Sequence, residues 1–255
     1  MESKNPEYLR LNHEMLPKVS EADYLQVQPY IDAAQAMAQL TYKSVYIIDY
    51  ARMNFLYVSE NPLFLAGRTA TEIQELGYSF YAQSVPEDDF LFLTHINQAG
   101  FDFFRNIPIY ERKRYSISYN FHLQIAHSKE YIFINHQLTP LVLDSEGNIW
   151  LALCLVSLAP TEEKHTAYIS AANSHKTWQF TMERKRWKLY ESIELTESEK
   201  AVIQLANQGF SVGEIASKIH RSEDSVKGYR KKLFAKLGVK SISEAISVAT
   251  HRKLI

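Results

Sequence analysis

The sequence has a single cysteine, Cys154, among its 255 residues. One thiol cannot form an intrachain disulfide, and it excludes zinc or redox sites of the Cys-x-x-Cys type. No apolar run approaches the ~18 residues that a membrane-spanning helix needs. The first residues, "MESKNPEYLRLNHEMLPK", also lack the apolar core of a signal peptide. These absences favour a protein of the reducing cytoplasm, without a membrane partner.

Features of enzymes are also scarce. The sequence shows no metal-ligand cluster, no phosphate-binding loop and no supported catalytic triad. The stretch "GFSVG" at 209–213 fits the Gly-x-Ser-x-Gly pattern of a nucleophile elbow, but that chemistry requires a preceding strand. The residues before it have helical periodicity, so we expect Ser211 to be a helix cap. The sequence therefore predicts a protein that is not an enzyme.

Charge is present but unevenly distributed. Residues 195–255 contain 11 Lys/Arg and 6 Asp/Glu, or +5, whereas residues 1–194 contain 17 and 23, or −6. Within 225–240, "SVKGYRKKLFAKLGVK", six of sixteen residues are basic and none is acidic. A basic segment on an acidic body is typical of a nucleic-acid-binding tail.

Helix start and stop signals recur through this basic tail. The pairs Thr196/Glu199, Ser211/Glu214 and Ser241/Glu244 have capping-box spacing, in which a hydroxyl and a carboxylate satisfy each other's backbone N–H groups. Ser222 begins a further segment, and Gly209 and Gly238 can take the left-handed conformation that ends a helix. We predict helices at about 197–208, 212–219, 223–237 and 242–252. Only three residues separate the second helix from the third, which predicts a helix-turn-helix.

The third predicted helix has two different faces. At 100° per residue, Val226, Leu233 and Leu237 form a buried stripe that Tyr229 flanks. The opposite side carries basic and small residues: Lys227, Gly228, Lys231, Lys232 and Ala235. A solvated lysine face usually has interspersed glutamates for i,i+4 pairing, and 225–240 has none. We therefore predict that this face binds DNA.

Residues 195–255 resemble the LuxR-type (GerE-like) helix-turn-helix domain. The resemblance rests on the Leu-Thr opening, Gly209, Glu-Ile-Ala in the second helix, Ser-Val-Lys at 225–227 and Lys-Leu-Gly-Val at 236–239. Departures from the family pattern occur at four positions: Ser198, Arg221, Gly228 and Tyr229. The resemblance implies that base edges are met by Lys227, Gly228 and Lys231. It places near the DNA backbone a second set: Ser222, Ser225, Arg230 and Lys232.

The preceding residues predict a mixed α and β domain. Residues 1–40 have helical character. Two strands, short helices and a long helix beginning at "PEDD" follow, and then three strands, of which the first alternates apolar residues over 115–125. The order, with "YIIDYARMNFLYVSENPLFLAGRTATEI" and "VPEDD", is similar to a PAS domain over roughly 40–160. A PAS-like domain senses a small ligand, a cofactor or a partner, so the resemblance does not identify the signal.

We expect no bound flavin, haem or metal in this domain. Flavin-adduct PAS domains need a cysteine in a particular helix, and Cys154 lies in a late predicted strand. Haem would need an axial histidine, for which His95 on the long helix is a candidate. A lone histidine on such a helix is usually a surface or core residue. The alternative that this domain binds an unidentified small-molecule ligand therefore stays open.

The overall prediction is an α+β chain with four parts. These are a helical segment at 1–40, a PAS-like antiparallel sheet with flanking helices at 41–160, a connector of short strands at 161–194, and an all-α helix-turn-helix domain of four helices at 195–255. The predicted function is a sequence-specific transcriptional regulator that binds double-stranded DNA and whose PAS-like domain senses a signal or mediates dimerisation. The alternative is a protein-interaction adaptor that lacks specific DNA readout. We also expect a homodimer, formed through an exposed seam of the last helix: Ile242, Ala245, Val248 and Ala249.

Overall fold

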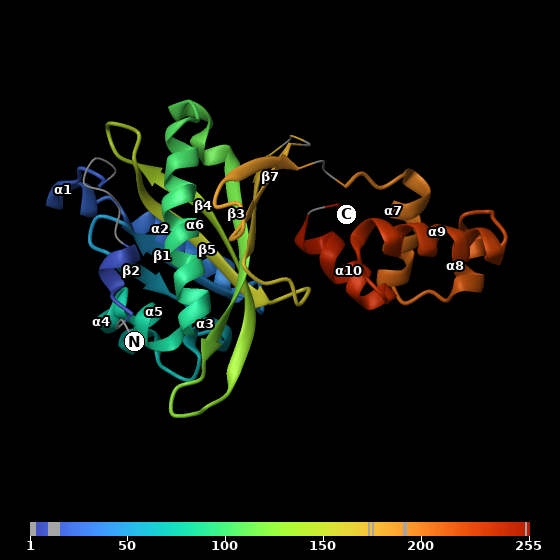
Figure 1. The fold of residues 1–255 in the computed structure, drawn as a ribbon, viewed down its shortest axis with the longest axis horizontal. Coiled ribbons are helices and arrows are strands. Elements are labelled where there is room, and N and C mark those ends of the chain that lie inside the picture. Colours follow the sequence, from blue (N-terminus) through green and yellow to red (C-terminus); the bar gives the residue numbers. More distant parts are fainter. Residues whose placement is uncertain (1–3, 10–15, 173, 175, 191–192, 253) are drawn as a thin grey trace. The chain divides into compact units, whose positions relative to one another are not determined.

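Eight strands form the centre of the first of two units in this chain (Figure 1). The computed structural model describes residues 4–9, 16–172, 174, 176–190, 193–252 and 254–255. The first unit comprises Met1–Ala159 and Glu163–Tyr190, and the second comprises Pro160–Glu162 and Glu191–Ile255. The first is a sheet with helices and the second is helical, which confirms the predicted α+β class. None of the described helices combines the length and apolar character needed to span a bilayer.

The sheet is antiparallel and has the order β2-β1-β5-β4-β3-β6-β7-β8. Its strands are β1 (Ser44–Asp49), β2 (Asn54–Val58), β3 (Tyr115–Gln124), β4 (Tyr131–Leu143), β5 (Ile149–Leu158), β6 (Thr166–Ala171), β7 (Thr177–Thr181) and β8 (Trp187–Tyr190). The helices of the first unit are η1 (Pro6–Leu9), α1 (Glu21–Tyr24), α2 (Gln28–Gln39), α3 (Pro62–Leu65), α4 (Ala70–Leu76), α5 (Ser79–Ser84), α6 (Glu87–Arg105) and η3 (Ile109–Arg114). Two strands, four α-helices and three strands thus follow one another over 44–158, as the sequence predicts.

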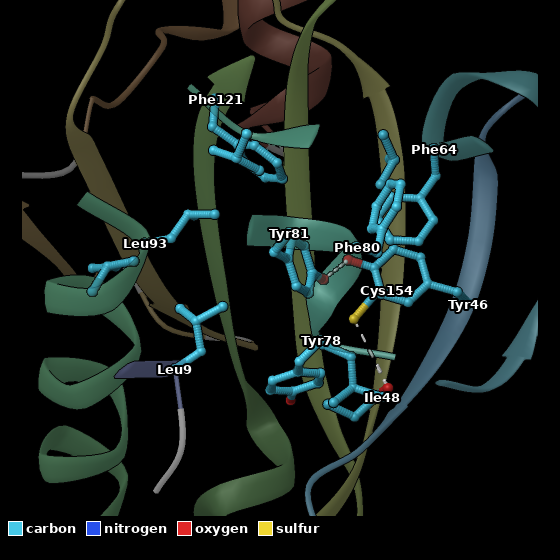
Figure 2. Packing of buried hydrophobic residues seen from close by; sticks show 14 of the residues in the cluster. Leu9, Tyr46, Ile48, Phe64, Tyr78, Phe80, Tyr81, Leu93, Phe121 and Cys154 are labelled. Atoms are coloured by element: carbon cyan, nitrogen blue, oxygen red, sulfur yellow. Dashed lines mark hydrogen bonds between the residues drawn. The ribbon is translucent and has the colours of Figure 1, made fainter. Parts of the chain in front are cut away.

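Strand β1 is buried on both faces of the sheet. Side chains alternate between the faces of a strand, so Tyr46 and Ile48 pack in a core with α6, while Val45 and Ile47 pack in a second core with α2. The six residues of β1 are all buried, which explains why this strand reads as a continuous apolar run. The core on the α6 side is rich in aromatic rings, and Figure 2 shows part of it.

Residues 161–194, expected as a connector of short strands, contain β6, β7 and β8, and these strands continue the sheet beyond β3. Ile117 of β3 lies opposite Ile169 of β6, so β3 has a paired strand on each side. An unpaired β3 would leave a row of backbone N–H and C=O groups open to other chains. The extension satisfies these groups within the chain.

One carboxylate ties three distant parts of the first unit together. Asp89, in the first turn of α6, is only 4% exposed. Its Oδ2 accepts hydrogen bonds from the backbone N–H of His122 at 2.7 Å and contacts the Nδ1 atom of the same residue at 2.7 Å, while its Oδ1 lies 2.9 Å from Nε2 of His165. The negative charge also lies at a helix N-terminus, where the helix dipole favours it. His95, the candidate haem ligand, bonds instead through Nδ1 to the Leu91 carbonyl of its own helix.

Candidate nucleic-acid interface

Four capped helices build the second unit, at nearly the predicted bounds. They are α7 (Glu197–Asn207), α8 (Val212–Lys218), α9 (Glu223–Leu237) and α10 (Ile242–His251). Thr196 and Ser211 form complete capping boxes with Glu199 and Glu214. Ser211 therefore has the predicted role of a helix cap.

Only one of the two hydrogen bonds of the predicted Ser241 capping box forms as predicted. The Ser241 hydroxyl accepts the Glu244 N–H at 3.1 Å, as expected. The Glu244 carboxylate, however, accepts the N–H of Lys240 at 2.8 Å, one residue before the cap. Spacing alone does not distinguish the two donors, because both lie within reach of the same side chain.

The turn between α8 and α9 brings these two helices together. His220 takes a left-handed φ of 53°, and the Arg221 N–H bonds to the Ala216 carbonyl at 2.9 Å. Ser222 then caps α9 by accepting the Ser225 N–H at 3.2 Å. This turn fixes the start of α9 against the end of α8 and thereby determines which face of α9 is exposed.

The buried stripe of α9 is confirmed. Val226 has no exposed surface and packs with α7 and α8, in a cluster with Val202 and Ile215. Leu233 and Leu237 pack in a second cluster with residues of α7 and α10. Tyr229 is half-buried beside the first cluster. Because both clusters lie on one side of α9, the other side is left to solvent.

The structure places the predicted DNA-contacting residues in two groups. The exposed group on the outer side of α9 consists of Lys227, Gly228, Lys231 and Lys232. No carboxylate of the described residues lies within ion-pair distance of Lys231 or Lys232. We call these four residues the basic face.

The other predicted residues lie at the margin of the basic face. Ser222 is exposed and Ser225 half-buried, and their hydroxyl oxygens are 2.9 Å apart in the cap. Arg230 is half-buried, with its guanidinium 5.7 Å from the centre of the Phe234 ring. These three side chains thus already take part in contacts within the unit.

Lys227 has acidic neighbours that the charge pattern of 225–240 did not reveal. Its Nζ lies 3.3 Å from Asp224 Oδ1 and 4.0 Å from Glu223 Oε2. These residues precede the basic stretch, at the i−3 and i−4 positions where helix pairs form. The pairs are exposed, so each contributes at most about 1 kcal/mol and water or a phosphate can replace it.

Lys236 belongs to the core side and not to the basic face. Its Nζ lies 2.6 Å from Glu199 Oε2 and donates to the Glu194 carbonyl at 3.1 Å. Glu199 is 2% exposed. Burial acts to raise the pKa of the Glu199 carboxyl, but bonds from Lys236 and from Thr196 outweigh it and hold that pKa below its ordinary value. Residue spacing predicts the cap at Glu199 but not this ion pair, because the two partners are 37 residues apart in the chain.

Gly228 provides the first test of the basic face. A Cβ atom placed on it would meet nothing within 4 Å, so packing does not require glycine there. We expect Gly228→Ala to raise the free energy of unfolding by about 1 kcal/mol, the usual difference between glycine and alanine inside a helix. Urea unfolding followed by circular dichroism measures this change. Gly238→Ala is the control, and it should destabilise because Gly238 has a φ of 69°. If the Gly228→Ala protein is no more stable than the parent, a Cβ atom at position 228 is not accommodated as the structure indicates.

The predicted dimer seam on the last helix is wrong. Val248 is 1% exposed, and Ala245 and Ala249 are fully buried against α7 and α9. Ile242 is half-buried against the same cluster. The apolar spacing of α10 therefore reflects packing within the unit, which a periodicity argument cannot separate from an exposed seam.

A helix-turn-helix with a basic outer face on its second helix is the module that these elements define. Residues 194–249 match the family described as "Bacterial regulatory proteins, luxR family". This segment is therefore a luxR-type domain within a longer chain. No curated protein matches the sequence.

Solved structures give weaker similarities over most of the chain. A phage VqmA–DPO complex is 15% identical with a TM-score of 0.32, and the alignment covers 93% of this chain and 92% of that one. A Vibrio cholerae VqmA dimer is 19% identical with a TM-score of 0.31 and 86% coverage of each chain. At these values the similarity carries no argument about fold or function.

Proposed function

We propose that the protein is a cytoplasmic, DNA-binding transcriptional regulator. The luxR-type domain with the exposed basic face on α9 is the observation that carries this proposal. The helix enters the major groove with Lys227, Gly228 and Lys231 toward the base edges, where lysine can bond to guanine and glycine allows close approach. Ser222, Ser225, Arg230 and Lys232 lie toward the phosphates.

Lysine replacement on the basic face tests DNA recognition. A DNA site selected by the protein from a random pool is compared with unselected DNA at two salt concentrations. We expect Lys227→Ala and Lys231→Ala each to weaken binding to the selected site by about 1–3 kcal/mol if the lysine meets a base edge. A lysine that meets only phosphate should weaken binding to both DNAs equally and lower the salt slope by about one unit.

Lys200→Ala, on α7, is the control for charge, because its ammonium pairs with Glu197 at 2.9 Å and not with α9. If both α9 variants bind DNA with the affinity of the parent, the basic face is a solvated surface that does not contact DNA. That result would favour the alternative of a protein-interaction adaptor, in which the luxR-type domain does not bind DNA selectively.

The first unit is the PAS-like sensor of this regulator. Two observations support this assignment. Two strands, four α-helices and three strands follow one another in the order of a PAS domain, and the polar residues of the PAS-like sequence lie at the ends of these elements. Asp49 ends β1 and accepts the backbone N–H of Ala51 and Arg52 at 3.0 and 3.2 Å. Asn61 occupies the N-cap position of α3, and its side chain donates to the Thr41 carbonyl at 3.2 Å, while Thr69 caps α4 with its hydroxyl. These side chains shape the loops between the first strands and the helices.

The regulator acts as a homodimer, because helix-turn-helix proteins usually bind two half-sites. With the α10 seam buried, the contact falls on the outer face of α2 and its C-cap, which exposes Ala33, Ala36, Met37 and Leu40. Leu40 is 90% exposed, and exposed apolar patches mark association surfaces. A second copy of the chain, with the same patch, matches this surface.

Charge on the α2 face should separate the two copies. We expect the double variant Met37→Glu, Leu40→Glu to be monomeric at micromolar concentration, where the parent is a dimer, because each carboxylate would be buried unpaired in the contact. Sedimentation equilibrium measures the mass. Gln35→Glu, exposed on another side of the helix, should stay dimeric. A monomeric parent, or a dimeric double variant, would contradict the assignment.

A further inference from the structure

The hairpin that β7 and β8 form is a basic part of an acidic unit. Residues 177–190 contain four Lys/Arg and one Asp/Glu, or +3, whereas residues 1–194 as a whole are at −6. The hairpin ends the strand order of the sheet, of which β8 is the last strand (Figure 1). Its four basic side chains are all exposed: Arg184, Lys185, Arg186 and Lys188. We call residues 177–190 the basic hairpin.

The charges of the basic hairpin are not neutralised within the described part of the chain. No carboxylate of the described residues lies within ion-pair distance of its four basic side chains. Other basic residues of the same unit do have partners: Lys18 and Arg52 each pair with a glutamate, at 2.7 and 2.8 Å. Charges of one sign that lie close together repel one another and attract a polyanion. The basic hairpin therefore has the electrostatic character of a surface that binds phosphates.

Hydrogen bonds hold the turn of the basic hairpin in one shape. The Thr181 carbonyl accepts the backbone N–H groups of both Arg184 and Lys185, at 3.1 and 2.9 Å. Trp187, the first residue of β8, donates its indole N–H to the Ala99 carbonyl of α6 at 2.8 Å. The backbone from which the basic side chains project is thus ordered before a partner binds, so binding orders only the side chains.

Lys185 occupies a turn position that favours glycine. Its φ is 48°, in the left-handed region that glycine enters without steric cost and that lysine rarely adopts. Protection of an edge strand against aggregation explains a lysine on the strand itself, such as Lys188. It does not explain a lysine at a turn position where the side chain lowers stability. Backbone strain of this kind clusters at functional sites.

The chain limits how far the basic hairpin can lie from the helical unit. Six residues connect Tyr190, the last of β8, to Glu197, the first of α7. Such a connection spans at most about 25 Å when fully extended, and the length of β8 adds about 13 Å. The turn is therefore less than about 40 Å from the start of α7, and one turn of DNA is about 34 Å long. The backbone that flanks a site bound by α9 is within reach of the basic hairpin.

We propose that the basic hairpin binds the phosphate backbone of DNA beside the site that α9 reads, so that the sheet unit adds a sequence-independent contact to the selective one. Arginine and lysine bind phosphate through charge-assisted hydrogen bonds, and each such contact releases counterions from the DNA. Backbone contacts position a protein on the duplex without reading its sequence. The inference rests on the proposed function as a DNA-binding regulator, and it assigns the sheet unit a second surface for the same partner.

Removal of two charges from the basic hairpin tests the contact. The probes are a duplex with the selected site and one helical turn of flanking sequence on each side, and a random duplex of the same length. We expect the double variant Arg186→Gln, Lys188→Gln of the full chain to bind both duplexes about tenfold more weakly at about 0.1 M salt, and to lower the salt slope by about two units. The ratio of the two affinities should stay that of the parent. Fluorescence anisotropy of labelled DNA measures both affinities.

Lys18→Gln, Arg52→Gln is the matched control, because it also removes one lysine and one arginine from the sheet unit. Lys18 contacts the β4–β5 turn and Arg52 lies in the β1–β2 turn, at the end of the sheet opposite the turn of the basic hairpin. Both side chains already pair with glutamates. This control should bind both duplexes with the affinity and salt slope of the parent.

Lys185→Gly separates a role in binding from a role in folding. Glycine suits the left-handed φ at this position, so the thermal midpoint of the sheet unit, followed by tryptophan emission, should rise by about 2–4 °C. The affinity for both duplexes should nevertheless fall about threefold for loss of one phosphate contact. A lysine with only a structural role would change the midpoint and leave the affinity unchanged.

The proposal is overturned if the double variant binds both duplexes like the parent, or if the control loses as much affinity. Co-sedimentation with vesicles of phosphatidylserine and phosphatidylcholine is measured in parallel. Loss of vesicle binding with DNA binding unchanged would assign the basic hairpin to a membrane surface and reject the DNA contact.

The outcomes also separate this contact from the proposed function. If the parent selects a site and the hairpin variants bind like the parent, the hairpin contact alone is rejected. If the parent binds all duplexes equally and the double variant still loses affinity, the selective regulator is rejected and the hairpin contact stays. A parent that binds no DNA overturns both.

Discussion

Replacing Val226 with aspartate is expected to unfold the helical unit while the sheet unit stays folded. Val226 has no exposed surface and packs with Val202 and Ile215. An unpaired carboxylate there costs several kcal/mol. A core of about 60 residues supplies only roughly 3–5 kcal/mol in total, so a single buried charge is enough to remove the folded state.

Circular dichroism and tryptophan emission together measure this result. The three tryptophans, Trp150, Trp178 and Trp187, all lie in the sheet unit, so their emission reports on that unit alone. We expect the helical signal of 197–251 to be lost while tryptophan emission stays as in the parent. Ala235→Asp adds the same charge at an exposed position of α9 and should stay folded. A fully helical Val226→Asp protein would show that Val226 is not in the core.

Replacing Lys236 with methionine is expected to destabilise the helical unit by about 2 kcal/mol. Removing one partner of a buried ion pair typically costs about 3–5 kcal/mol, because the other charge is left uncompensated. Lys236 is 38% exposed, so water screens part of this loss, while Glu199 is 2% exposed. Urea unfolding followed by circular dichroism gives the free energy.

The double variant Lys236→Met, Glu199→Gln should recover most of the lost stability. Glutamine can still accept the Thr196 N–H in the capping box but carries no charge. If the double variant is as unstable as Lys236→Met alone, the loss comes from packing of the lysine stem and not from the ion pair.

The ion pair also predicts how stability depends on pH. The pKa of Glu199 is lower in the folded state, so the unfolded chain binds the proton more readily. The contribution is therefore present above the unfolded pKa of glutamate, about 4.3, and is lost as pH falls through the lower folded value. Glu199→Gln should abolish this part of the acid dependence.

The local signals in the sequence predict the helical unit closely. Caps and terminating glycines depend on neighbouring residues, so Thr196, Ser211 and Ser222 could be assigned from spacing alone. The spacing also separates the buried Val226 from the exposed Lys227. The features of the helical unit that the sequence did not predict depend on tertiary contacts. The apolar residues of α10 turned inward, and Glu199 acquired a partner 37 residues away.

The sheet unit is less predictable for the same reason. Strand periodicity gives the existence of β3 but not its neighbours, and its pairing with β6 joins residues about fifty positions apart in the chain, such as Ile117 and Ile169. The place of Leu9 in the fold could not be predicted from the sequence either. Nothing in "PEYL" at 6–9 predicts that Leu9 would reach a space between α6 and the sheet.

The strand order has a consequence for the time course of folding. β1 pairs with β5, so Ser44 must find Val156 across more than a hundred residues before the centre of the sheet exists. The core of the helical unit needs only contacts within residues 193–254. Folding slows as contacts become more distant in sequence, from microseconds–milliseconds for helical bundles to milliseconds–seconds for sheets. We therefore expect the helical unit to reach its native state first, although it is made last, so that for an interval the chain has a formed α9 while the sheet is still incomplete.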